Sequence, residues 1–101
     1  SIICMVTDKS MSPDYKAGDY VGGIQYDAAQ GISSHIGSTC IITLDEEIIQ
    51  VRKILLGKNE QIFLCPTNIQ YESEMINKQD ILSIASIIWH RRAFTGHSND
   101  A

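Results

Sequence analysis

Short runs of β-prone residues alternate with clusters of turn-forming residues along the whole chain, and this pattern constrains the fold more than any other feature. Isoleucine, valine, threonine and aromatic side chains concentrate in the runs, while Gly, Pro, Asp, Asn and Ser fill the gaps. The pattern predicts a mostly β fold in which antiparallel hairpins pack into a small β-sandwich or a partly closed barrel. The expected strands are residues 2–6, 20–26, 39–44, 48–56, 61–65 and 81–89.

The segments between these runs carry local turn signals. Residues 8–19 contain Ser, Pro, Asp and Gly and are expected to form turn and loop. Residues 45–47 are expected to join the two strands beside them into a hairpin. Pro66 ends a strand, because proline has no N–H to donate to a ladder. Residues 27–38 are expected to be a polar loop, with a weak helical tendency at 28–30.

Length and composition are those of one folded domain. The chain has 101 residues, 44% of them hydrophobic and 20% charged, which excludes intrinsic disorder. We expect residues 1–95 to form the domain and residues 96–101 a flexible tail. A net charge of −4 argues against nucleic-acid contact by this segment itself. The longest apolar run, residues 81–89, is far too short to cross a bilayer, so no membrane association is expected.

The cysteines and histidines do not form a metal or disulfide pattern. The three cysteines lie far apart among apolar neighbours, which predicts reduced core thiols and a cytoplasmic protein. The histidines are scattered and are expected to be structural or solvated, so no metal and no cofactor is predicted. These residues are Cys4, Cys40, Cys65, His35, His90 and His97.

One local motif stands out near the start of the chain. Ser10-Met11-Ser12-Pro13 is followed by Gly18-Asp19 directly before an expected strand. Taken alone, the motif is compatible with a Ser/Pro turn followed by a Gly-Asp turn. The residues after the last strand, Arg91 and Arg92, are compatible with a phosphate or partner contact and also with a solvated strand end.

Ser10-Met11-x-Pro13 and Gly18-Asp19 resemble the nucleophile segment of the LexA, UmuD and phage-repressor family of serine–lysine self-cleaving domains. The resemblance continues in the same order through residues 3–92. Gly37 opens a strand, residues 50–55 resemble an apolar–Lys–basic–apolar strand, and the last stretch resembles Leu-x-Pro-x-Asn-x-x-Tyr. That stretch here is Leu64-x-Pro66-x-Asn68 with Tyr71. The resemblance implies the fold of a LexA-like C-terminal domain.

The resemblance also implies that Ser10 is a nucleophile and that a lysine is its general base. Burial on an apolar surface lowers the pKa of such a lysine, and the neutral amine then takes the serine proton. Two registers are open. Matching Val51-Arg52-Lys53-Ile54 to Val-Lys-Arg-Leu puts Arg52 in the base position, where arginine cannot act as a base. Counting back from Pro66 puts Lys53 there, and strand alternation places Lys53 on the more apolar face, which favours Lys53 as the base.

The chain departs from the family pattern at Asp8, where the family has Gly, and it contains no Ala-Gly cleavage segment. We therefore expect the C-terminal regulatory and dimerisation domain of a phage-repressor-type transcription regulator with an impaired site. The alternative is an active self-peptidase that cleaves its own upstream linker. By resemblance the partner is a second copy in a homodimer, which uses a strand edge or residues 81–89. DNA is contacted only through an N-terminal helix-turn-helix domain absent from this chain.

Overall fold

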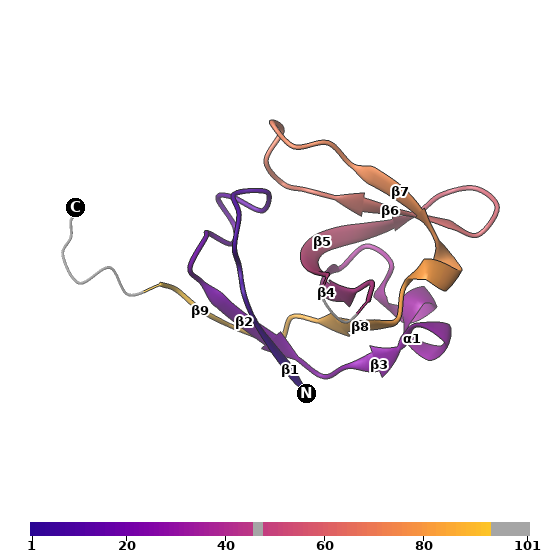
Figure 1. Ribbon diagram of the computed structural model, residues 1–101, viewed down its shortest axis with the longest axis horizontal. Helices are drawn as coiled ribbons and strands as arrows, with labels where there is room; N and C mark the ends of the chain where they lie inside the picture. Colours follow the sequence, from indigo (N-terminus) through magenta and orange to yellow (C-terminus); the bar gives the residue numbers. More distant parts are fainter. Residues whose placement is uncertain (46–47, 94–101) are drawn as a thin grey trace.

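A computed structural model describes residues 1–45 and 48–93, in which the β-prone runs form two antiparallel sheets (Figure 1). The expected hairpin of residues 39–44 and 48–56 is present. The elements in chain order are β1 (Ile2–Met5), β2 (Tyr20–Gly23), β3 (Tyr26–Asp27), α1 (Ala28–His35), β4 (Thr39–Thr43), β5 (Ile49–Leu56), β6 (Gln61–Cys65), β7 (Glu74–Asn77), the 3-10 helix η1 (Lys78–Asp80), β8 (Ser83–Ser86) and β9 (Trp89–Arg91).

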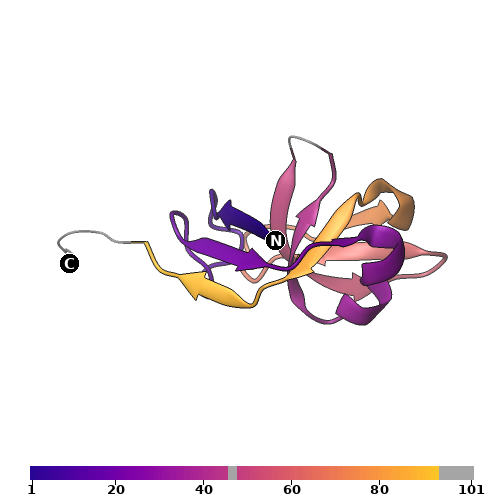
Figure 2. The same cartoon turned by 90° about the horizontal axis from the view of Figure 1, so that it is seen from below.

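The strand order explains the shape of the molecule. The small sheet has the order β1-β2-β9 and the large sheet the order β3-β8-β4-β5-β6-β7, with antiparallel pairing throughout. Figure 2 shows the small sheet at one end of the molecule and α1 at the other. The mostly β fold of antiparallel hairpins predicted from the sequence is confirmed, and the two sheets do not close into a barrel.

The large sheet is buried on both faces at its centre, which a run of consecutive apolar residues makes possible. On β4, Ile41 packs with Val51 and residues of the small sheet, while Cys40 and Ile42 pack with α1 on the other face. The side chains of Cys40, Ile41 and Ile42 are at most 1% exposed. The two clusters form separate cores, one between the sheets and one beneath α1.

The expected loop at residues 27–38 is wrong over most of its length, because Ala28–His35 is an α-helix. Its buried positions, Ala28, Gly31, Ile32 and His35, follow the i, i+3, i+4, i+7 spacing of a helix face. Two of the four are a glycine and a histidine, which hid the stripe in the sequence. Burial of this face against β8 stabilises a helix of 8 residues, which is too short to be stable by itself.

The expected single strand at residues 81–89 is also wrong. The chain leaves the large sheet after β8 and enters the small sheet as β9, so the two strands belong to different layers. Ile87 and Ile88 make the crossing, and the Ile88 N–H donates to the Gly22 carbonyl. Strand β7 had no counterpart among the expected strands.

Only part of the cysteine prediction is confirmed. All three thiols are free, but Cys40 alone is fully buried, while Cys4 and Cys65 are half-buried. Burial raises the pKa of Cys40 to about 12. Among the described residues, no helix has the length and apolarity needed to cross a membrane. The tail expected at residues 96–101 lies outside the described residues.

Candidate functional site

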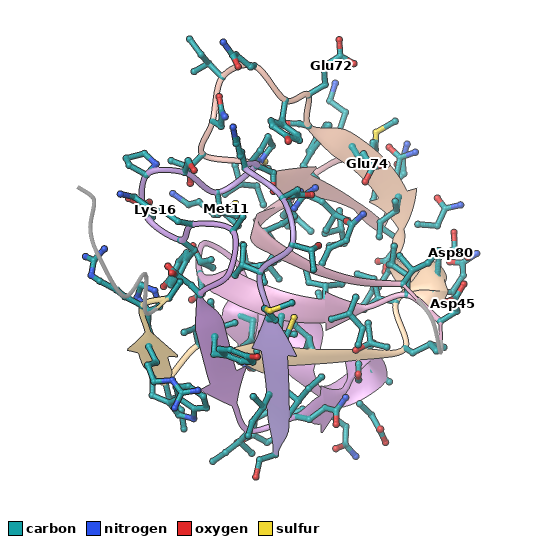
Figure 3. All side chains as sticks on the ribbon, turned by 60° about the vertical axis from the view of Figure 1, so that its left-hand side comes forward. Met11, Lys16, Asp45, Glu72, Glu74 and Asp80 are labelled. Atoms are coloured by element: carbon teal, nitrogen blue, oxygen red, sulfur yellow. The ribbon has the colours of Figure 1, made fainter. Side chains whose placement is uncertain are left out.

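The loop between β1 and β2 carries Ser10 and is anchored by its neighbour Met11. Met11 is 1% exposed and packs in the core between the sheets. Figure 3 labels it on this loop. The loop is closed at its base, where Val6 N–H donates to the Asp19 carbonyl and Gly18 N–H to the Val6 carbonyl. Gly18 has a φ of +94°, a conformation that favours glycine, which explains the Gly-Asp pair.

Residues 68–71 hold the same loop from the other side. The Asn68 N–H donates to the Ser10 carbonyl at 2.9 Å, and the Asn68 amide donates to the Lys9 carbonyl at 3.0 Å. The Lys9 N–H points at the Tyr71 hydroxyl at 3.4 Å. The Asn-x-x-Tyr part of the motif therefore fixes the backbone on both sides of the serine, a role that the sequence alone did not reveal.

Strand β5 brings Arg52 to Ser10. Its Nη1 donates to Ser10 Oγ at 2.7 Å and to the Val51 carbonyl at 2.9 Å, so the side chain turns back over its own strand. Arg52 pairs with Cys40 of β4, whereas β6 begins to pair with β5 only at Lys53. At Arg52, the edge of β5 that faces away from β4 is therefore not covered by β6. The guanidinium reaches Ser10 across this open edge.

Lys53 lies elsewhere. Its side chain is exposed, and its residue pairs with Thr39 and Cys65 in the middle of the sheet. No hydrogen bond joins Lys53 to the serine loop among the described residues. Of the two residues weighed from the sequence, the structure brings Arg52 to Ser10 and leaves Lys53 in solvent.

Asp8 occupies the remaining side of Ser10. Its Oδ1 accepts the Ser10 N–H at 3.0 Å and the Ser10 Oγ–H at 2.6 Å, an arrangement in which an Asp binds its own backbone two residues on. Desolvation raises the pKa of Asp8, but the hydrogen bonds from the Ser10 side chain and backbone and the charge of Arg52 outweigh it. The pKa therefore lies below its ordinary value.

These contacts form a chain in which Arg52 donates to Ser10 and Ser10 donates to Asp8. Both the hydroxyl and the N–H of the serine are occupied, although an acyl-transfer site needs the hydroxyl free to meet a base and the N–H free to stabilise an oxyanion. The surrounding cleft has a volume of only about 30 Å³. It is lined by Cys4, Met5, Val6, Thr7, Asp8, Ser10, Ile49, Gln50, Val51 and Arg52.

A second polar centre, around Asp19, ties the serine loop to β9. Asp19 is 2% exposed and accepts the N–H groups of Lys16 (2.9 Å) and Ala93 (2.8 Å) and His90 Nε2 (2.7 Å). Burial raises the pKa of Asp19, but these hydrogen bonds and the charge of His90 outweigh it and hold the pKa below 3.8. The pairing of Asp19 with His90 could not be predicted from the sequence, because 71 residues separate the partners.

The other histidines do not join the site. His35 lies on the buried face of α1, where its Nδ1 is 2.5 Å from the Gly31 carbonyl oxygen. His97 lies outside the described residues. Over the described part of the chain, no group of three or more His, Cys, Asp or Glu side chains is placed to hold a metal ion.

Comparison with models of protein families places the serine loop and β5 within a known family. A family model described as Peptidase S24-like matches residues 1–88, which include the serine loop, β5 and the 68–71 segment. No curated protein matches the sequence significantly.

Proposed function

The chain belongs to the Peptidase S24-like family, that of LexA, UmuD and phage-repressor C-terminal domains, and on this premise we propose that it is a regulatory and dimerisation domain that does not cleave itself. The observation that carries the proposal is the 2.7 Å hydrogen bond from Arg52 to Ser10 Oγ. A guanidinium keeps its proton in proteins, so it cannot take the serine proton as a neutral lysine would.

Asp8 does not replace the missing base. A general base works best when its pKa lies near the working pH, and the pKa of Asp8 is lowered from an already acidic value. Asp8 also occupies the serine N–H, a natural oxyanion donor. The small cleft leaves no room for a peptide segment beside the hydroxyl. Base, oxyanion donor and substrate access are thus all impaired by two residues, Asp8 and Arg52.

The regulator role is proposed from family membership. In this role the domain holds two copies of the protein together, and a helix-turn-helix domain outside this chain occupies two DNA half-sites. We assign the homodimer contact to the free edge of β9, because β8 already has a strand on each side. We place the protein in the cytoplasm, where its three free thiols stay reduced.

The test uses a fluorophosphonate probe, which labels serines that have been activated as nucleophiles, and reads the product by intact mass. We expect no labelling of the wild-type chain and slow labelling of the double variant Asp8→Gly/Arg52→Lys. That variant supplies a lysine and frees both serine groups. Adding Ser10→Ala must abolish the labelling.

The same experiment tests the alternative, an active peptidase with Ser10 and Lys53 as the catalytic pair. That site would require β5 to slip by one residue so that Lys53 replaces Arg52 beside the serine. Labelling of the wild type that is lost in Lys53→Ala but kept in Arg52→Ala would establish the alternative and refute our proposal.

A further inference from the structure

The small sheet has an apolar face that points to solvent. In its register, Ile3, Gly22 and Trp89 form one cross-strand row, and Met5, Tyr20 and Arg91 form the next. We call these six residues the outer face. Its large apolar side chains are 66% (Ile3), 46% (Met5), 36% (Tyr20) and 40% (Trp89) exposed. The solvated side of an antiparallel sheet is ordinarily polar, so this face is an exception.

A hollow of about 500 Å³ opens at one end of the outer face. It is lined by Met5, Gly18, Tyr20, Arg91, Arg92 and Ala93. The Arg91 guanidinium carbon lies 5.1 Å from the centre of the Tyr20 ring, a cation–π contact that holds this charge over the hollow. The hollow therefore combines an aromatic floor with two cationic side chains.

Within residues 1–45 and 48–93, the positive charge in the hollow has no partner of opposite charge. Among the described residues, no carboxylate forms an ion pair with Arg91 or Arg92. Asp19 lies close to this segment in space, but it is buried and already accepts three N–H donors. Figure 3 shows Glu74 and Asp80 at the opposite edge of the view from the β9 end. A local cationic site thus stands on a chain with a net charge of −4.

We propose that this hollow binds an acidic segment of a partner protein that carries apolar side chains. Carboxylates of the segment pair with Arg91 and Arg92, which suit bidentate carboxylate recognition. Its apolar side chains cover Met5, Tyr20 and their neighbours on the outer face. A nucleic acid fits less well, because the net negative charge of the chain repels a polyanion and the aliphatic side chains of Ile3 and Met5 offer no hydrogen bond to a base. The proposed dimer contact at the edge of β9 lies in the plane of the sheet and leaves this face open.

The chain contains its own reporter for the test. Trp89 is the single tryptophan and lies on the outer face, so its fluorescence responds to an occupant. The probe is a synthetic peptide of alternating Glu and Leu residues, titrated into the whole chain. We expect saturable binding that weakens at high salt and falls about tenfold or more, roughly 1.4 kcal/mol, in Arg91→Gln/Arg92→Gln.

The matched control removes two cations from another part of the surface. Lys53→Gln/Lys58→Gln changes the net charge equally, and it is expected to bind the peptide as the wild type does. Arg92→Gln alone removes a side chain that forms no hydrogen bond or ion pair with residues 1–45 or 48–93, so it reports on binding if the double variant folds poorly.

Four results would overturn the proposal. The first is equal binding of a Lys/Leu peptide, which would show unspecific apolar adsorption. The second is an equal loss in the lysine control. The third is tighter binding of a single-stranded DNA oligonucleotide, which would assign the hollow to nucleic acid. A loss of self-association in Ile3→Glu would likewise show that a second copy occupies this face.

Discussion

At the scale of single residues, two aspartates define the state of the serine loop. Asp8 is exposed and hydrogen-bonds to Ser10 alone among the described residues, while Asp19 is buried and joins the serine loop to residues 90–93. Both have lowered pKa values, because in each case hydrogen bonds and a nearby positive charge outweigh desolvation. One residue thereby blocks the serine, and the other holds its loop in place.

Asp19 makes the stability of the fold depend on pH. A carboxyl group whose pKa is lower in the folded state than in the unfolded state stabilises the fold at pH values above the unfolded-state pKa. That stabilisation is lost as the pH falls through the folded-state pKa. We expect Asp19→Asn to lower the free energy of unfolding at neutral pH by about 1–3 kcal/mol. The difference from wild type should shrink as the pH falls below the ordinary aspartate pKa, because the unfolded state then binds a proton, and it should vanish once the pH has passed the lowered pKa of the folded carboxyl.

Urea unfolding at several pH values measures this difference. Asp80→Asn, which removes an exposed carboxylate of η1, is the control and should change stability little at any pH. A constant difference across the pH range would contradict the assignment of the charge effect to Asp19.

At the scale of elements, α1 is held by packing and not by propensity. Gly31 sits in its interior, where glycine normally destabilises a helix by about 1 kcal/mol relative to alanine. A Cβ at this position would lie 2.8 Å from Ile84 Cγ2 and 3.1 Å from Tyr26 Cβ. The glycine therefore allows the helix to lie close against β8.

Gly31→Ala is expected to destabilise the protein by about 1–3 kcal/mol in spite of the better helix propensity, because Ile84 is fully buried and cannot move aside. Thermal or urea unfolding measures the change. Ser33→Ala, on the exposed face of the same helix, should stay within about 0.5 kcal/mol of wild type. A higher unfolding midpoint in Gly31→Ala would show that propensity and not packing dominates.

At the scale of the whole molecule, the free sheet edges limit how two copies can join. β1 and β9 are the edges of the small sheet, and β3 and β7 are the edges of the large sheet. β3 has only two residues, which leaves little backbone to pair. Edge-to-edge association through β9 would extend the small sheet across a two-fold axis.

Amide hydrogen exchange at low and high protein concentration tests this contact. We expect exchange in β9 to slow as the dimer forms, while exchange in β7, the longer edge of the other sheet, stays the same. Sedimentation over the same concentrations gives the mass. A monomer throughout, or protection of β7 instead, would be incompatible with the β9 contact.

The sequence by itself determined the β class, the hairpin of β4 and β5 and the loop with Ser10, because these depend on local periodicity and turn chemistry. It also carried the family resemblance, which is a property of residue order. Only the tertiary structure decided that Arg52 meets Ser10, that Asp19 meets His90 and that the last apolar run divides between two sheets. The reason is physical: a side chain as long as arginine can turn back over its own strand. Strand alternation and spacing along the chain do not show which residues from distant segments lie within reach of that side chain.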